Sequence, residues 1–223
     1  MLEKDSLHRF LIEHTNVRGE WVHLDATWQA VLERGDYPPV VKETLGEAMA
    51  AVALLAATLK FKGSLVMQIS GDGPIGMLVV QATSERTLRG LAHFEGDVPP
   101  GDLVARFGNG RMVITIDPGE GMERYQGVVG LVGDSLGEAL RDYFERSEQL
   151  PTQLWLAADG SAAAGLLIQR MPGPEEDADA WNRAVTLAET VTREELLTLN
   201  AQQVLHRLYH EEDAARPRQG GDQ

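Results

Sequence analysis

The strongest chemical signal in the sequence is Gly133-Asp134-Ser135-Leu136-Gly137, which matches the pattern G-x-S-x-G. In many hydrolases this pattern places a nucleophilic serine on a sharp turn between a strand and a helix. The residues before and after it favour a strand and a helix respectively, so the context fits. The same letters contain Gly-Asp-Ser-Leu, the motif of another hydrolase group. A serine esterase that uses Ser135 is therefore one hypothesis for function.

A second interpretation of this segment needs no catalysis. A serine nucleophile requires a histidine base with an acid behind it, and the downstream histidines are only His206 and His210. Ser135 and Glu138 also have the spacing of a capping box, in which each side chain bonds a free backbone N–H at a helix start. The sequence favours the cap over the nucleophile.

Metal and nucleotide sites are poorly supported. His206 and His210 share a helix face at i, i+4, but the H-E-x-x-H glutamate and a nearby third ligand are missing, so we interpret them as a solvated face. The stretch from Gly71 to Gly76 matches G-x-G-x-x-G, yet an apolar strand follows it instead of the helix that a dinucleotide needs. The chain has no cysteine, which excludes thiolate metal sites and disulfides within it. We expect no cofactor and no metal.

Charge and hydropathy narrow the choice of partners. The net charge of −14 disfavours binding to nucleic acid or to an anionic membrane surface. The start of the chain has no apolar signal core, which predicts a cytoplasmic protein. Residues 48–59 are nearly all apolar, but twelve residues are too few to span a bilayer, so they predict a core helix.

The periodicity predicts an α+β fold with a mainly antiparallel sheet. We expect a core domain over residues 1–172, a linker over 173–177, a helical subdomain over 178–212 and a disordered tail over 213–223. Asn16 and Gly19 indicate an early turn, and Asp25 indicates a helix N-cap. The remaining expected elements are a helix at 39–59, a meander of short strands over 64–132, a helix at 136–149, strands at 153–158 and 163–171, and helices at 178–189, 192–197 and 201–211.

The helical subdomain has apolar faces on helices too short to be stable alone in water. These faces must pack on the core, on one another or on a partner. A surface for unfolded client proteins is the functional interpretation, since exposed apolar patches mark interaction sites. The candidate client-binding residues are Leu187, Val191, Leu196, Leu197, Leu199, Val204, Leu205 and Leu208.

Several stretches resemble one known family, the heat-shock protein thirty-three family of redox-regulated, ATP-independent holdase chaperones. They occur in the family's order over about residues 7–212, nearly the whole chain. The stretches are 17–20 (VRGE), 57–61 (ATLKF), 68–75 (QISGDGPI), 123–131 (ERYQGVVGL), 142–152 (DYFERSEQLPT), 194–199 (EELLTL) and 204–212 (VLHRLYHEE).

The resemblance implies a cytoplasmic chaperone with an α+β domain, a helical region that holds unfolded clients, and homodimers on activation. It also implies a C-terminal switch domain whose cysteines bind zinc, and we expect that domain to be absent because this sequence has no cysteine. The leading hypothesis is a holdase without its thiol switch. The alternatives are an inactive, degenerate relative and the Ser135 esterase.

Overall fold

The structure is a computed structural model that describes residues 5–13, 15–58, 62–119, 122–131, 133–173, 177 and 179–210. The predicted tail at 213–223 and most of the predicted linker lie outside these residues. The described elements are β1 (Ser6–Leu11), β2 (Val17–Leu24), α1 (Ala26–Leu32), α2 (Pro39–Thr58), β3 (Ser64–Ser70), β4 (Ile75–Thr83), β5 (Leu88–Phe94), α3 (Leu103–Phe107), β6 (Arg111–Asp117), β7 (Tyr125–Gly130), α4 (Leu136–Tyr143), the π-helix η1 (Phe144–Glu148), β8 (Thr152–Ala158), β9 (Ala163–Arg170), α5 (Ala180–Ala188), α6 (Arg193–Thr198) and α7 (Ala201–Tyr209).

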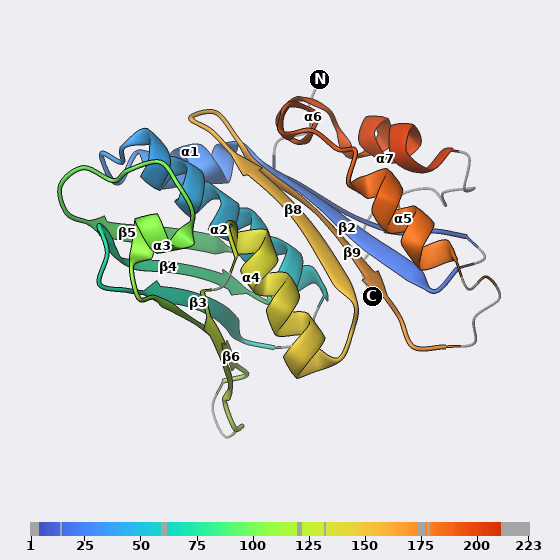
Figure 1. Ribbon diagram of the computed structural model, residues 1–223, viewed down its shortest axis with the longest axis horizontal. Helices are drawn as coiled ribbons and strands as arrows, with labels where there is room; N and C mark the ends of the chain where they lie inside the picture. The colour runs from blue at the N-terminus through green and yellow to red at the C-terminus, as the bar shows by residue number, and fades with distance from the viewer. Residues whose placement is uncertain are drawn as a thin grey trace.

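The strands form two antiparallel sheets, which confirms the predicted fold class. A four-stranded sheet has the order β1-β2-β9-β8, and a five-stranded sheet has the order β5-β4-β3-β6-β7. Helix α2 lies between the two sheets, and α5, α6 and α7 lie on the far face of the four-stranded sheet (Figure 1). The molecule is therefore layered as helices, sheet, helix and sheet.

Helix α2 is the buried centre of the fold. It begins at Pro39, where the missing N–H costs nothing, and small side chains let both sheets approach it. A Cβ at Gly46 would overlap the Cβ of Ala158, so the helix and β8 are in close contact there. The predicted core helix is thus confirmed. In the part of the chain that the structure describes, no helix is both long and apolar enough to cross a membrane.

The five-stranded sheet has one buried and one open face. In β3, Leu65, Met67 and Ile69 are fully buried against α2, while Gln68 between them is exposed. This alternation is typical of an antiparallel sheet with one face in water. The open face carries a transverse row of paired residues from Leu91 on β5 to Val128 on β7.

The strands over residues 64–132 are not one meander, so that prediction was wrong. β3, β4 and β5 follow one another, but the chain then returns along the opposite side of β3 as β6. Helix α3 carries it across the end of the sheet, with Leu103 and Phe107 buried in the core. The backbone oxygen of Phe107 accepts a hydrogen bond from the N–H of Gly73 at 2.9 Å, which fixes this crossing.

The prediction of a turn at Gly19 was also wrong. Gly19 lies inside β2 and pairs with Phe10 of β1. A Cβ at this position would overlap the Phe10 ring, so the glycine marks a close approach of that ring to the strand.

Candidate functional site: the interface between helices α5–α7 and the four-stranded sheet

Helices α5, α6 and α7 are short and have well-defined starts. They contain 9, 6 and 9 residues. Thr192 with Glu195 caps α6, and Asn200 with Gln203 caps α7, each as a reciprocal capping box. These caps explain why the sequence predicts the starts of α6 and α7 to within one residue.

The three helices cover the outer face of the four-stranded sheet with apolar side chains. We call this contact the helix–sheet interface. Its buried members on the strand side are Phe10, Ile12, Val17, Trp21, Ala157, Ala164, Leu166 and Ile168, and those on the helix side are Ala184, Ala188, Leu196, Ala201, Val204, Leu205, Leu208 and Tyr209.

The predicted client-binding residues all belong to this interface. Leu196, Val204, Leu205 and Leu208 are buried in it, at 0–5% exposure. The other four are partly buried and pack against it, namely Leu187, Val191, Leu197 and Leu199. In this conformation they contact the sheet, and client binding by them stays a prediction.

The strand side of the interface was not identified from the sequence, although a signal was present. β9 is buried along almost its whole length, and β2 is buried at seven of eight positions. A strand with both faces buried has a continuous apolar run instead of alternation. The run AAGLLI in β9 therefore indicates that something covers the outer face of the sheet.

Few polar contacts cross the interface. His23 Nε2 lies 3.0 Å from the backbone oxygen of Leu197. Trp21 Nε1 and His23 Nδ1 are buried and have no hydrogen-bond partner among the residues that the structure describes. A buried polar atom without a partner costs about 1–3 kcal/mol, so the closed interface is not optimised for stability at these two positions.

Arg193 connects α6 to the central helix around the edge of the sheet. Its Nη1 lies 2.8 Å from Glu43 Oε1 and 3.8 Å from Glu47 Oε1, both on α2, and its Nη2 donates to the backbone oxygen of Ala158. Burial, with the nearby Glu43 carboxylate, raises the pKa of Glu47 to about 7. Arg193 and Arg106 act in the opposite direction.

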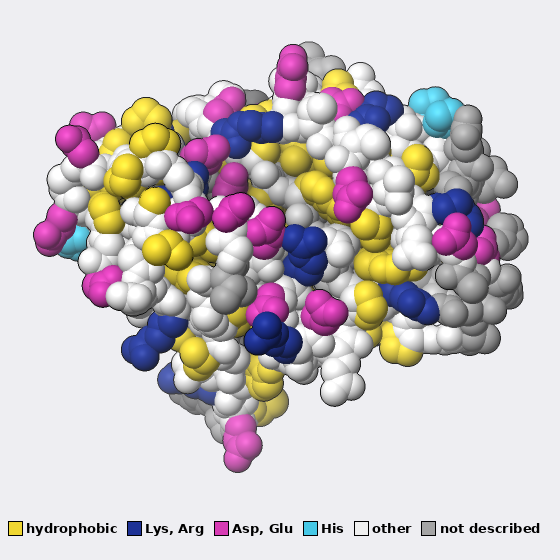
Figure 2. Space-filling view, in the orientation of Figure 1, with side chains coloured by type: hydrophobic (Ala, Val, Ile, Leu, Met, Phe, Trp, Pro, Cys, Tyr) yellow, Lys and Arg dark blue, Asp and Glu magenta, His cyan; other side chains and the backbone are white. Residues whose placement is uncertain are grey.

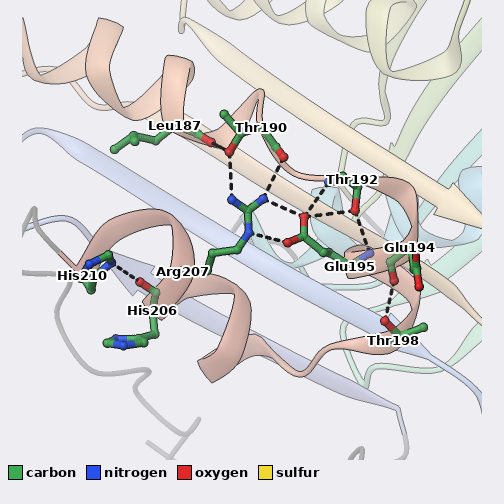
Figure 3. Close-up of polar contacts among 9 residues, drawn as sticks. All are labelled: Leu187, Thr190, Thr192, Glu194, Glu195, Thr198, His206, Arg207 and His210. Atoms are coloured by element: carbon green, nitrogen blue, oxygen red, sulfur yellow. Dashed lines mark hydrogen bonds and ion pairs between the residues drawn. The ribbon is translucent and has the colours of Figure 1, made fainter.

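Arg207 joins the three helices to one another (Figure 3). Its guanidinium donates to Oγ1 and the backbone oxygen of Thr190, at 3.1 and 2.8 Å, just after α5. It also bonds Glu195 of α6, with Nε 2.5 Å from Oε1 and Nη2 2.7 Å from Oε2. This two-pronged contact holds α5, α6 and α7 together as one unit.

The surface around these three helices carries both charged and hydrophobic side chains. Acidic side chains are scattered over the visible face, and hydrophobic side chains gather along the line between β8 and α5 (Figure 2). Trp155, Val185 and Leu187 are among the partly buried residues that pack against the interface. The edge of the interface is therefore partly open to solvent.

The other predicted candidates do not form a catalytic or metal site. Ser135 Oγ accepts a hydrogen bond from the N–H of Glu138 at 3.3 Å, and Glu138 Oε2 accepts one from the N–H of Asp134. Ser135 is thus a helix cap, with Glu138 bonding one residue earlier than a strict capping box. Among the described residues, no histidine lines the small cavity beside Ser135.

His206 and His210 lie on an exposed face of α7, with their ring centroids 5.0 Å apart. His210 Nδ1 is 2.9 Å from the backbone oxygen of His206 (Figure 3). Within the described ranges, no group of three or more His, Asp or Glu side chains could hold a metal ion.

Comparison with known proteins places this architecture in a family. Residues 5–219 match the family described as Hsp33 protein. The chain is 52% identical over 212 residues to the 33 kDa chaperonin of Nitrosococcus oceani, covering 95% of this chain and 73% of that protein. It is 50% identical over 218 residues to the 33 kDa chaperonin of Escherichia coli, covering 96% and 74%.

A solved structure shares the fold. The crystal structure of the 33 kDa chaperonin from Thermotoga maritima matches with a TM-score of 0.78 and 23% sequence identity, over 92% of this chain and 74% of that one. The serine esterase and the inactive relative gain no support from any of these matches. Because the family model matches most of the chain and chaperonins are about half identical to it, the chain belongs to the Hsp33 family and has the function of a chaperone.

Proposed function

We propose that the protein is an ATP-independent holdase that binds unfolded proteins with the two apolar sides of the helix–sheet interface. The observation that carries this proposal is that a large apolar face of the sheet is covered only by short helices. The covered surface is apolar and includes the buried side chains of Phe10, Trp21, Leu166 and Ile168, but it is covered only by three helices of 9, 6 and 9 residues.

The cover has properties of a separable unit. Isolated helices shorter than about 12–15 residues are marginal in water, so α5, α6 and α7 keep their structure only while they pack on something. Arg207 links them to one another, which favours their leaving the sheet together. Opening would also let Trp21 Nε1 and His23 Nδ1 reach water, which lowers its cost.

Opening would create the surface that a holdase needs. Large exposed apolar patches bind other apolar surfaces, and an unfolded client offers such surfaces in any sequence. Binding holds the unfolded client by mass action and keeps it from aggregating. The net charge of −14 favours solubility of the complex through mutual repulsion.

We further propose that this activity needs no nucleotide, metal or other cofactor, and that it takes place in the cytoplasm. We expect no nucleic-acid or membrane partner, and the family resemblance implies a second copy of the chain as a partner. Because the sequence contains no cysteine, the activity of this chain does not depend on thiol oxidation.

The test is light scattering of a heat-unfolding client in the presence of the protein, without nucleotide and with a chelator. We expect equal suppression of aggregation with and without reductant. A dependence on reductant would contradict a mechanism without a thiol switch. Absence of suppression in every condition would favour an inactive relative instead.

A variant of the Arg193 contact tests where clients bind. Arg193→Met removes the ion pair to Glu43 and the bond to Ala158 but keeps an apolar stem. The loss of one half-exposed ion pair and one hydrogen bond should raise the open population roughly two- to tenfold. Half-suppression of aggregation should then need less protein.

The matched control is Arg146→Met. Arg146 pairs with Asp142 at 2.7 Å along α4 and η1, away from the helix–sheet interface. This variant should suppress aggregation as the unchanged protein does. Equal activity of Arg193→Met and Arg146→Met would place the client surface elsewhere.

A further inference from the structure

A second cavity lies on the opposite side of the four-stranded sheet from α5–α7. It has a volume of about 660 Å³ and is bounded by β1, β2, the end of α2 and the β4–β5 hairpin. Leu7, Val22 and Leu24 line it and pack with the α2 side of the core instead of the helix–sheet interface. Its size falls within the roughly 300–1,000 Å³ that is typical of small-molecule sites.

Aliphatic side chains form the larger part of the cavity wall, and the hydroxyl side chains of Ser6, Thr27, Thr83 and Ser84 form the rest beside the charged residues. Ala53, Ala56 and Ala57 on the last two turns of α2 keep the space open, and Leu7 and Leu88 close its sides. The aliphatic part of the wall suits a flexible hydrocarbon chain, which is stabilised by burying its apolar surface there.

The rim of the cavity is basic, in contrast to the acidic chain. Arg9, Lys62 and Arg86 line it together with one acid, Asp5. The Asp5 carboxylate already accepts hydrogen bonds from the backbone N–H groups of Asp25 and Thr27 and from the Thr27 hydroxyl. The rim therefore has a net positive charge.

The three cations differ in how far they are neutralised. Arg9 Nε lies 3.8 Å from Glu20 Oε1, and Arg9 also donates to the backbone oxygen of Ala57. Lys62 and Arg86 are exposed and form no ion pair within the described part of the chain. At least two cations at the mouth are thus available to an anion.

Arg86 occupies a backbone conformation that favours glycine. Its φ is +63°, in the hairpin between β4 and β5 that is closed by the bond from the Arg86 N–H to the backbone oxygen of Thr83 at 2.9 Å. Glycine is the usual residue at such a left-handed position, because other residues are strained there. The turn itself therefore fixes the backbone of Arg86 and holds its side chain beside the cavity.

We propose that this cavity binds a small anionic amphiphile, with its aliphatic chain among the alanines and leucines and its anionic head beside Arg9, Lys62 and Arg86. The head is a carboxylate or a phosphate monoester, since both accept charge-assisted hydrogen bonds from guanidinium and ammonium groups. This inference does not depend on the proposed client surface, which lies across the sheet.

Isothermal titration calorimetry with decanoate, decyl phosphate, decanol and decyltrimethylammonium, all below micelle formation, tests the proposal. We expect one saturable site for the two anions, with at least about tenfold weaker binding of the alcohol and the cation. Equal binding of the cation would overturn the proposal, because it would show only general apolar binding. Binding to phosphatidylglycerol vesicles without binding of free decanoate would also overturn it.

Two substitutions of Arg86 distinguish an effect on ligand binding from an effect on the stability of the hairpin. Arg86→Glu should weaken decanoate binding at least about tenfold, and Arg34→Glu, a charge reversal on an exposed residue outside the cavity, should leave it unchanged. Arg86→Gly relieves the backbone strain, so it should leave Tm unchanged or raise it while weakening binding. Unaltered decanoate affinity in both Arg86 variants would show that the head group does not lie at this rim.

Discussion

The two faces of the four-stranded sheet are covered by helices of different kinds. On the inner face, α2 is one helix of 20 residues with buried side chains on all sides. On the outer face, three helices of at most 9 residues cover a surface that is just as apolar. The inner cover is part of the core between two sheets, whereas the outer cover packs on the rest of the molecule from one side only.

The five-stranded sheet shows how this chain builds a face that stays in water. Its open face carries Gln68, Arg89 and Arg111 among its apolar residues. The outer face of the four-stranded sheet instead carries Phe10, Trp21 and other large apolar side chains. That face is suited to being covered, either by the helices of this chain or by another polypeptide.

The largest effect is expected where the inner cover is damaged. Leu45 on α2 is fully buried between the sheets, and Leu45→Ala should lower the free energy of global unfolding by about 2–5 kcal/mol. Urea denaturation followed by circular dichroism measures it. A loss below about 1 kcal/mol would show that the inner layer is not a single close-packed core.

The same substitution in the outer cover should act locally. Leu205→Ala should lower the free energy of opening of α5–α7 by about 2 kcal/mol, because it leaves a cavity in the helix–sheet interface. Hydrogen exchange should become faster in α7 but not in α2. Equal acceleration in both helices would mean that the two covers unfold together.

Leu91→Ala is the matched control for both leucine variants. Leu91 lies on the open face of the five-stranded sheet and is 53% exposed. Its loss should change global stability by less than about 0.5 kcal/mol and leave the exchange of α7 unchanged.

The stability of the folded protein should depend on pH through Glu47, which lies on α2 where Arg193 of α6 contacts it. The pKa of Glu47 is raised to about 7, so the folded protein binds this proton more tightly than the unfolded chain does. Stability must therefore fall as pH rises from about 4.5 to 7. The side chain introduced by Glu47→Gln cannot ionise. Raising the pH from 4 to 8 should therefore lower the free energy of unfolding of the variant by about 1–3 kcal/mol less than it lowers that of the unchanged protein.

Denaturation curves at several pH values measure this difference. The groups that set the pKa are Glu43 on the same helix, Arg106 and Arg193. A parallel pH dependence of the two proteins would show that Glu47 is solvated in the folded state.

Apart from the Leu91→Ala control, the smallest effect is expected at the cap of α4. Ser135→Ala removes the acceptor for the Glu138 N–H and should cost about 1 kcal/mol of stability. Ser135→Asp should restore most of it, because aspartate is an equally good cap. Hydrolysis of a short acyl ester that is lost in Ser135→Ala would contradict the cap as its only role.

Local signals in the sequence predict most of the elements. The caps at Asp25, Ser135, Thr192 and Asn200 each have an oxygen-bearing side chain before a helix, and the structure shows all four bonds. The apolar faces of α6 and α7 likewise identify the helix side of the interface, because a helix face repeats over a few residues.

What the sequence does not predict depends on contacts between distant segments. The position of β6 beside β3 follows from how α3 packs, and Gly19 is required by the Phe10 ring of another strand. The cavity beside α2 needs residues from β1, β2, α2 and the β4–β5 hairpin at once. Spacing along one segment does not contain this information.

The placement of the tryptophans gives the protein a built-in optical signal. Of the four, Trp21, Trp155 and Trp181 lie in or against the helix–sheet interface, whereas Trp28 is in the inner core and bonds the backbone oxygen of Asp159. Their emission should shift to longer wavelength when water reaches them. Release of the outer helices can thus be followed in real time by intrinsic fluorescence, on the unlabelled chain and during an encounter with a client.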